Sequence, residues 1–526
     1  MKHVSLFVFG LLGFLLPMGA FAQKVGSDNG DTISGAKRLN QVFRMINENY
    51  VDIPDMNSLS EVAISAMLKD LDPHSLYIPA RDVQKANEGL QGNFEGVGIS
   101  FQIVKDTIRV ADVIAGGPSE KVGILPGDKI LKIDGLPAVG DSVDNNFVQN
   151  HLRGKKGSKV VIRVLRNGKE YDFNVVRGTV PIYSIDSYFM ANDTVGYIRL
   201  IRFARTSVKE FRDACNNLRK KGMNSLILDL RGNTGGFLDV AYGLANEFLS
   251  GKKLIVYTEG RKQKRQNFVS NNRGIFQSGK LVVLIDEGSA SASEIVAGAV
   301  QDWDRAVLVG RRSFGKGLVQ RMYTLSDGGQ VRLTTARYYT PSGRCIQRPY
   351  DDGADAYRDE MKHRLLHGEL VCQDSIHLDD SLIYKTHAGR TVYGGGGIMP
   401  DVFVPMDTTK LSDYFVEVRG QGLLNEFTIQ WADTHREECE KNGFESFDEK
   451  YMSYGIDSLF ASYVNEVGVK RDFEAEAECP ERIEKSDKYQ SLVLKALIAK
   501  SLFGNEYYYK VMCVADDVYL KAMTEF

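Results

Sequence analysis

The strongest constraint on the fold is the alternation of continuous apolar runs with helical patterns between residues 183 and 310. Three runs, SLILDL (225–230), KLVVLID (280–286) and RAVLVG (305–310), are apolar at most positions. Such runs are typical of strands that are covered on both faces, as in a parallel sheet. The segments between them, such as 292–300, have helical spacing instead. This order predicts an α/β core with a largely parallel sheet.

Upstream of this core, residues 92–179 have the pattern of a small domain built from short strands. The segments 160–165 and 171–176 flank Asn167-Gly168, and this dipeptide strongly predicts a two-residue hairpin turn. Residues 116–135 combine a short helical segment, a Pro-Gly turn and a strand. Together these signals predict a separate domain of mixed β/α structure.

Both ends of the chain have helical spacing. From about Thr32 to Leu90 apolar residues recur at i, i+3, i+4 and i+7, as on one face of a helix. Residues 349–390 are polar and charged and are predicted to form an insertion, and helical spacing returns beyond Leu411. With 526 residues the chain is too long for one ordinary domain.

The first residues predict export. Lys2 and His3 precede an apolar run from Val4 to Leu16, and Ala20-Phe21-Ala22 places small residues at the two positions that define cleavage. This pattern is typical of a secretory signal peptide cut after Ala22. The apolar run is shorter than the ~20 residues that cross a bilayer. We therefore expect a periplasmic or extracellular protein without a membrane span.

Charge and cysteine content exclude several classes of function. A net charge of −2 argues against a general nucleic-acid binder, which needs a basic surface. The six cysteines include no C-x-x-C pair, so we predict neither a zinc ribbon nor a redox dithiol. His363 and His367 are spaced i, i+4, but the glutamate of a zinc-protease motif is missing between them. No metal or cofactor is predicted. Cys345 and Cys372 either bracket the insertion with a disulfide or stay free.

A serine cluster is the first candidate for chemistry. The stretch Gly288–Glu294, GSASASE, lies between an apolar run and a helical pattern. A serine at such a turn has an accessible hydroxyl, and nearby backbone N–H groups can stabilise an oxyanion. Serines also cap helices and pack tightly, so the segment alone does not decide. A serine nucleophile needs a base, and no histidine lies near this turn in the sequence.

Lys316 is an alternative base. It lies between Gly315 and Gly317, and burial could lower its pKa from about 10.4 until the amine accepts a proton. Gln320 would face the same side of a strand and could hold the amine in place. Taken alone, Lys316 is more simply interpreted as a surface lysine on a glycine-rich turn.

The segment LDLRGNTGG (228–236) is a glycine-rich turn that could supply an oxyanion donor or hold a phosphate. The phosphate alternative gains some support from residues 310–316, which match most of a P-loop. Gly317 replaces the hydroxyl that would bind magnesium, and strand patterns follow where a P-loop opens a helix. Nucleotide hydrolysis is therefore a remote alternative.

Taken together, these motifs resemble a carboxy-terminal processing peptidase, also called a tail-specific protease. DPHSLYI (72–78) resembles the amino-terminal signature of that family, and FEGVGISF (94–101) resembles its PDZ domain. LDLRGNTGG, GSASASEIVAGAVQD, FGKGLVQ, YYTPSGRCIQ and GIMPDV resemble the segments of its protease core, in the same order. Thr234 stands where the family usually has proline, and Cys345 where serine is common.

The resemblance implies a serine–lysine mechanism, with the lysine 25 residues after the nucleophile (316 − 291 = 25), which selects Ser291 over its neighbours. Ser291 would attack the peptide carbonyl, Lys316 would act as general base and then general acid, and Gln320 would orient the lysine. The oxyanion would be held by N–H groups of Ala292 and of Gly235 or Gly236, with Gly236 preferred. Asp302 matches a family acidic position and is expected to support the structure.

The resemblance also implies a peptide-binding site in the PDZ domain. There a peptide C-terminus adds a strand to the sheet, and a loop of backbone N–H groups holds its carboxylate. The corresponding residues are Gly96, Val97, Gly98, Ile99 and Phe101.

The implied fold is an α/β multidomain protein with a crotonase/ClpP-like protease core, an inserted PDZ domain and helical terminal regions. The predicted boundaries are a signal peptide at 1–22, an N-terminal helical region at 23–90, a PDZ domain at 91–180, the protease core at 181–348, an insertion at 349–390, the end of the core at 391–410 and a C-terminal helical domain at 411–526.

The predicted function is that of an exported serine endopeptidase. Its expected partners are proteins or peptides with apolar C-termini, and the terminal helices suggest a possible homodimer. The alternative is a PDZ-containing scaffold that binds peptides without cleaving them. Retention of Ser291, Lys316 and Gln320 together argues against that alternative.

Overall fold

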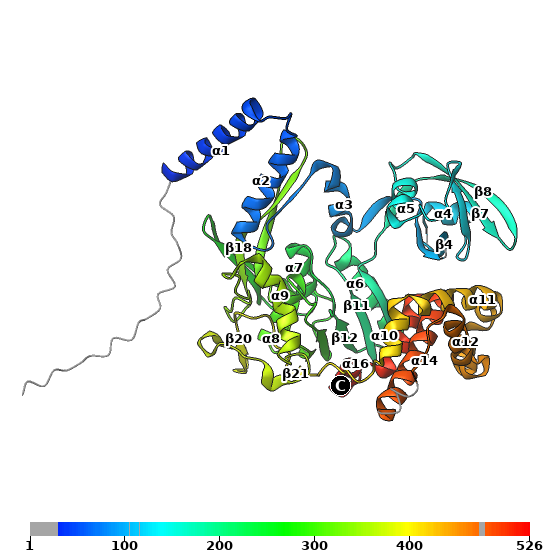
Figure 1. Ribbon diagram of the computed structural model, residues 1–526. Helices are drawn as coiled ribbons and strands as arrows, with labels where there is room; N and C mark the ends of the chain where they lie inside the picture. The colour runs from blue at the N-terminus through cyan, green and yellow to red at the C-terminus, as the bar shows by residue number, and fades with distance from the viewer. Residues whose placement is uncertain (1–29, 105, 115, 473–478) are drawn as a thin grey trace, which may run out of the picture. The chain divides into compact units, whose positions relative to one another are not determined.

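The computed structural model describes residues 30–526 except 105, 115 and 473–478 (Figure 1). The predicted signal peptide and its cleavage site lie outside the described residues. The chain divides into two compact units, up to Ala66 and from Met67 to Phe526. The first unit contains α1 (Gly30–Asn49) and most of α2 (Met56–Leu71). Across the described residues, no helix has both the length and the apolar character to span a bilayer.

A six-stranded sheet forms the centre of the second unit. Its strand order is β10-β11-β12-β15-β16-β21, and only the β10–β11 pair is antiparallel. The strands are β10 (Ile185–Met190), β11 (Val195–Leu200), β12 (Ser225–Asp229), β15 (Leu281–Ile285), β16 (Val307–Gly310) and β21 (Val402–Phe403). The predicted, largely parallel α/β core is therefore confirmed.

Alternate residues of these strands face two different apolar layers. Leu226, Leu228 and Val283 belong to a core shared with α6 (Ser207–Lys220), α7 (Leu238–Asn246) and α8 (Ala292–Asp302). Ile227, Val282 and Leu284 belong to a second core, which they share with residues of the C-terminal segment. The period of two along a strand explains this division. Burial on both faces explains why these runs are apolar throughout.

A second, antiparallel sheet lies beside the serine-containing turn. Its order is β1-β18-β13-β14, and β17 also pairs with β18. The strands are β1 (Leu76–Ile78), β13 (Leu254–Gly260), β14 (Gln263–Val269), β17 (Leu318–Thr324) and β18 (Gln330–Tyr339). The β17 strand begins directly after the loop that carries Lys316.

Residues 93–181 form a separate mixed domain that follows α3 (Ala80–Gln91). Its sheet has the order β3-β4-β5-β7-β8, with β6 paired to β5, and β2 pairs with β9 where the chain enters and leaves. The elements are β2 (Asn93–Gly96), β3 (Ile99–Val104), β4 (Thr107–Val113), α4 (Pro118–Val122), β5 (Lys129–Ile133), β6 (Leu136–Pro137), α5 (Asn145–Leu152), β7 (Lys159–Arg166), β8 (Lys169–Val176) and β9 (Gly178–Pro181). The predicted hairpin turn is present, and both Asn167 and Gly168 have positive φ.

The predicted insertion contains α9 (Gly353–Leu366), two short 3₁₀ helices (Gln373–Ser375 and Asp380–Leu382) and part of the hairpin of β19 (Ile383–Lys385) and β20 (Thr391–Tyr393). All six cysteines are free. Three of them, Cys215, Cys439 and Cys513, are buried.

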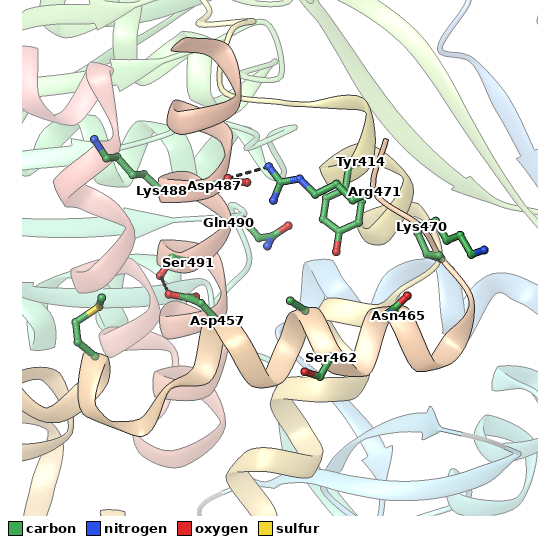
Figure 2. A pocket seen from close by; sticks show the side chains of 13 residues that line it. Tyr414, Asp457, Ser462, Asn465, Lys470, Arg471, Asp487, Lys488, Gln490 and Ser491 are labelled. Atoms are coloured by element: carbon green, nitrogen blue, oxygen red, sulfur yellow. Dashed lines mark hydrogen bonds and ion pairs between the residues drawn. The ribbon is translucent and has the colours of Figure 1, made fainter. Parts of the chain in front are cut away.

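The C-terminal region is helical, as predicted. Its elements are α10 (Asp413–Gly420), α11 (Leu423–Lys450), a 3₁₀ helix (Tyr451–Tyr454), α12 (Ile456–Val467), α14 (Pro480–Phe503), α15 (Asn505–Met512), a 3₁₀ helix (Cys513–Ala515) and α16 (Asp517–Met523). Residues of α12 and α14 line a cavity of about 950 Å³. Figure 2 shows that its walls pair Arg471 with Asp487 and Ser491 with Asp457.

Candidate active site

The serine cluster and the glycine-rich turn meet at one edge of the central sheet. β12 and β15 are parallel neighbours, so the turns that follow them lie side by side at their carboxyl ends. The backbone N–H of Ala290 donates to the carbonyl of Asn233 at 2.9 Å, which ties the two turns together. α8 begins at Ala292, so Ser291 stands at the start of a helix as predicted.

The three serines of the cluster have different environments. Ser289 and Ser293 are completely buried, and their hydroxyls donate to the carbonyls of Leu230 at 2.8 Å and Asn233 at 2.7 Å. They therefore hold the two turns together. Ser291 instead lines a cavity and has φ +56°, a left-handed value that is unusual for serine. The surrounding hydrogen bonds hold this strained backbone in place.

Glu294 joins the serine turn to the lysine loop. Its side chain is fully buried, and one carboxylate oxygen accepts from the backbone N–H groups of Ser291 at 2.7 Å and Lys316 at 2.9 Å. The other oxygen accepts from Ser313 Oγ at 2.6 Å and from Gly315 N–H at 2.7 Å. Burial raises the pKa of Glu294, while these four donors act in the opposite direction.

Lys316 lies in the loop before β17, and Gln320 lies within that strand. Nζ of Lys316 donates to Oε1 of Gln320 at 3.2 Å, so the two side chains face the same side, as their spacing of four residues predicted. Nε2 of Gln320 in turn donates to the carbonyl of His74 at 2.5 Å. No hydrogen bond joins Ser291 Oγ to Lys316 Nζ among the described residues.

Burial controls the charge of this site. It lowers the pKa of Lys316 below its usual 10.5; the negative charge of Asp72 opposes the shift, and the positive charge of Arg332 adds to it. Burial also lowers the pKa of His74 to about 3, with a further contribution from the charge of Lys316. His74 is therefore neutral at pH 7, and its Nε2 lies 3.0 Å from the hydroxyl of Tyr357.

In the glycine-rich turn after β12, Gly235 and Gly236 differ in the hydrogen bonding of their N–H groups. The N–H of Gly235 donates to Oδ1 of Asn233 at 2.9 Å. The N–H groups of Gly236 and Ala292 have no hydrogen-bond partner in the described part of the chain. A Cβ on Gly235 would lie 2.9 Å from Cβ of Ser291, and one on Gly236 would lie 2.1 Å from the carbonyl oxygen of Phe203. Only glycine fits at these two positions.

A cleft of about 290 Å³ brings the predicted residues together. Its walls include Ser291, Ala292, Lys316, Gln320, Gly235 and Gly236. The remaining walls are mostly apolar and come from Leu90, Thr234, Phe237, Leu238, Ile295, Leu318, Val319, Met322, Arg332 and Tyr338. An apolar cleft with a few convergent polar groups is typical of an enzyme active site.

Comparison with known proteins identifies the family. Residues 194–352 match peptidase family S41, residues 96–176 match the PDZ domain, and residues 414–504 match a family of unknown function. The carboxy-terminal-processing protease of Bartonella bacilliformis is 37% identical over 354 residues, which cover 66% of this chain and 80% of that protein. The chain belongs to peptidase family S41. The resemblance to carboxy-terminal processing peptidases is thereby confirmed, together with the mixed α/β fold and the PDZ domain.

Further relatives and solved structures are similar to parts of the chain. A probable CtpA-like serine protease of Staphylococcus aureus is 33% identical over 62% of this chain and 65% of its own length. Among solved structures, the photosystem II D1 C-terminal processing protease has 25% identity and a TM-score of 0.36, and the match covers 70% of this chain and 92% of that one. The PDZ domain of a Vibrio cholerae carboxy-terminal protease, solved with a peptide, has 28% identity and a TM-score of 0.16, and the match covers 16% of this chain and 96% of that one.

In this S41 chain the predicted PDZ residues lie at one end of the PDZ sheet. β3, which carries Ile99 and Phe101, is the last strand of the sheet and, among the described strands, pairs with β4 alone. Gly96 ends β2, and Gly98, with φ +80°, turns the chain into β3. Val97 and Ile99 are buried in the domain core. An edge strand is the element to which a bound peptide can add.

Two residues that hold the proposed catalytic groups of this S41 site, Glu294 and His74, were not predicted from the sequence. Glu294 was signalled by the Ser-x-x-Glu spacing of a capping box, starting at Ser291. His74 lies in the DPHSLYI motif (72–78), but only the fold brings its carbonyl group to Gln320. An ion pair outside the cleft walls was not predicted either: Asp229 and Arg231, at the end of β12, lie 2.7 Å apart, and Arg231 also pairs with Asp516 at 2.7 Å. No local pattern links Arg231 to Asp516, because the two residues lie far apart in the sequence.

Proposed function

We propose that the chain is an exported serine endopeptidase that cleaves proteins recognised by their C-terminal tails. The observation that carries the proposal is the cleft, which Ser291, Lys316, Gln320 and Gly236 line together. The lowered pKa of Lys316 supports a lysine that accepts a proton, and its bond to Gln320 supports a fixed amine. The names of the S41 relatives support the substrate class.

The reaction begins with attack of Ser291 Oγ on the carbonyl carbon of the scissile peptide bond. Lys316 Nζ takes the hydroxyl proton as the new C–O bond forms. The tetrahedral oxyanion accepts hydrogen bonds from the N–H groups of Gly236 and Ala292. Gly236 is preferred over Gly235, because the N–H of Gly235 already bonds to Asn233.

Collapse of this intermediate breaks the C–N bond. Lys316 then gives its proton to the leaving amine, which departs with the C-terminal fragment, and the N-terminal fragment remains as an ester on Ser291. A water molecule, deprotonated by Lys316, attacks this ester and releases the second product. Gln320 acts as a positioning residue, because it holds Nζ at 3.2 Å and is itself anchored to His74.

In this proposal the PDZ domain recognises the substrate's tail. A peptide C-terminus pairs with the free edge of β3, and the loop Gly96-Val97-Gly98 binds its carboxylate. The partly buried Phe101 and the buried Ile99 favour an apolar terminal residue. Residues 1–22 direct export and are removed, as the sequence predicts.

The test uses the chain from Gln23 onward and an unfolded reporter protein with an apolar tail. Parent, Ser291→Ala and Lys316→Ala proteins are compared, with a charged-tail reporter as control. We expect cleavage by the parent alone, and less of it with the charged tail. Equal cleavage by all three would contradict the serine–lysine assignment. Tail-dependent binding without cleavage by the parent would favour the scaffold function instead.

A further inference from the structure

The charged side chains on the cleft walls are all basic. Among its wall residues only Lys316 and Arg332 are basic, and none is acidic. In the proposed mechanism Lys316 is the proton acceptor and is neutral before attack. Arg332 then remains as the one fixed charge on the cleft walls, and it has no role in the proposed chemistry.

The guanidinium of Arg332 is only partly bonded. Arg332 lies on β18, in register with Leu76 of β1 and Met322 of β17. Its Nη2 donates to the carbonyl of Ala86 and to Oδ1 of Asn87, both at 3.1 Å. Its Nε is buried without a hydrogen-bond partner, and Nη1 makes no hydrogen bond to any described residue. A guanidinium has five N–H donors, so more than half of its donors are unused.

Several other arginines in the described part of the second unit pair with a carboxylate, whereas Arg305 bonds to the carbonyls of Phe248 and Phe276 instead. Three buried or largely buried arginines each pair with a carboxylate: Arg231 with Asp229, Arg312 with Glu369 and Arg344 with Asp302. No carboxylate among the described residues pairs with Arg332. Burial alone lowers its pKa, without an opposing acidic charge. A partly desolvated cation without a partner is unfavourable, and an incoming carboxylate would relieve this cost.

We infer that Arg332 binds a carboxylate of the peptide substrate and thereby sets the position of the scissile bond. This inference rests on the proposed function, in which the cleft holds the peptide. The carboxylate is either the free C-terminus of the substrate or the side chain of an aspartate or glutamate. A guanidinium with Nε and Nη1 unused can bind it through two hydrogen bonds.

The test measures kcat/KM for two pairs of peptides. One pair differs only in a free or an amidated C-terminus, and the other, amidated in both members, differs in Asp or Asn at one position near the cleavage site. Parent, Arg332→Gln and Arg332→Lys proteins are compared. Because the PDZ domain meets the same peptides in every protein, its own preference cancels from the comparison.

We expect the parent to prefer the carboxylate in one pair, by roughly ten- to a hundredfold, as for a hydrogen bond to a charged group. Arg332→Gln should remove that preference, and Arg332→Lys should restore part of it. The pair that responds identifies the source of the carboxylate. Arg321→Gln is the matched control, since Arg321 is exposed on the neighbouring strand β17.

A different result would overturn the inference. If Arg332 only anchors α3 through Ala86 and Asn87, its replacement lowers kcat/KM for all four peptides by the same factor. If the parent cleaves none of the peptides, the proposed function fails. The binding constants of fluorescent forms of the same peptides are then measured, and their ratios within each pair replace the ratios of kcat/KM. A carboxylate preference in binding that is independent of Arg332 would then exclude the site.

Discussion

The carboxylate of Glu294 accepts a hydrogen bond from the backbone N–H of Lys316 at 2.9 Å. The same oxygen accepts from the N–H of Ser291, so one buried group sets the separation between the proposed nucleophile and the proposed base. The hydrogen bonds of the two Glu294 oxygens go to backbone N–H groups and to Ser313 Oγ, and none of those in the described residues goes to Ser291 Oγ or Lys316 Nζ. Glu294 is therefore a positioning residue, and its effect on the reaction passes through the backbone.

The first prediction concerns Glu294→Gln. The amide keeps one acceptor oxygen but turns an NH₂ group toward two donors, so the loops carrying Ser291 and Lys316 should separate. A displacement of about 1 Å can cost on the order of a hundredfold in rate. We expect kcat to fall by about this factor, with KM changed much less, in steady-state cleavage of an unfolded reporter.

The control for this variant is Glu287→Gln. Glu287 pairs with Arg311 at 2.8 Å, in the same turn region, but is not a wall residue of the cleft. The Glu287→Gln variant should keep kcat within a few-fold of the parent value. Equal losses in both variants would mean that Glu294 stabilises the turn without positioning the dyad.

The second prediction concerns pH and Lys316. A lysine base acts only when deprotonated, so kcat/KM should rise with pH up to the lowered pKa of Lys316 and then level off. Lys316→Arg should be inactive over the whole range, since a guanidinium remains protonated. A rate that falls steadily between about pH 6 and 9 would contradict the assignment.

The third prediction follows from the same pKa shift and concerns stability. The folded-state pKa of Lys316 lies below the unfolded value of 10.5, so the unfolded chain binds more protons between these two values. The contribution of Lys316 to stability should therefore rise with pH across that interval. Lys316→Met should be more stable than the parent at neutral pH, and the difference should shrink as pH rises toward 10.5.

Lys209→Met is the control of opposite sign. The hydrogen bond to Asp213 raises the pKa of the exposed Lys209, so its replacement removes a small stabilisation at neutral pH. Chemical unfolding at several pH values measures both variants. A Lys316→Met protein that is less stable than the parent at pH 7 would show that Lys316 is not destabilised by burial.

Much of this arrangement was predictable from local patterns. The apolar runs around Ile227 and Val283 predicted buried parallel strands, and Asn167-Gly168 predicted its hairpin because both residues must adopt positive φ. The serine turn was also predictable, since strand, small residues and helix follow in order. The roles of Ser289 and Ser293 were not, because their acceptors belong to another segment.

The C-terminal segment was predicted only as helical packing. Helical spacing shows that a helix has an apolar face but does not show which surface covers it. In the structure, Val518, Tyr519 and Ala522 of α16 pack on the face of the central sheet that carries Ile227 and Leu284. That Arg332 pairs with no carboxylate of the described residues could not be predicted from local patterns either. It depends on which charged side chains the fold brings together.

The fourth prediction tests this packing. The ring of Tyr519 contacts that of Tyr197 edge to face, with centroids 5.8 Å apart, and Tyr519 is buried. Tyr519→Ala should lower the free energy of opening of the central sheet by about 3 kcal/mol. Hydrogen exchange in β12 and β15 measures this change. Leu520→Ala, at the exposed neighbouring position, should stay within about 0.5 kcal/mol of the parent.

The fifth prediction concerns the buried ion pair between Asp302 and Arg344. Their charged groups lie 2.7 Å apart with side chains that are 1% and 0% exposed. Arg344 also donates to Gln301 Oε1 at 2.7 Å and to the carbonyl of Tyr393 at 3.0 Å, so it connects the end of α8 to β20. This agrees with the structural role expected for Asp302.

Arg344→Met removes the cation and leaves the carboxylate of Asp302 buried without its partner. Breaking such a pair costs about 3–5 kcal/mol, much of it from the unpaired charge. The double variant Asp302→Asn with Arg344→Met should therefore be more stable than Arg344→Met alone. The exposed pair of Lys209 and Asp213 provides the comparison, and Lys209→Ala should change stability far less than Arg344→Met does. If the double variant is no more stable than Arg344→Met, the loss comes from the packing of Arg344 and its bonds to Gln301 and Tyr393, and the charge of Asp302 contributes little.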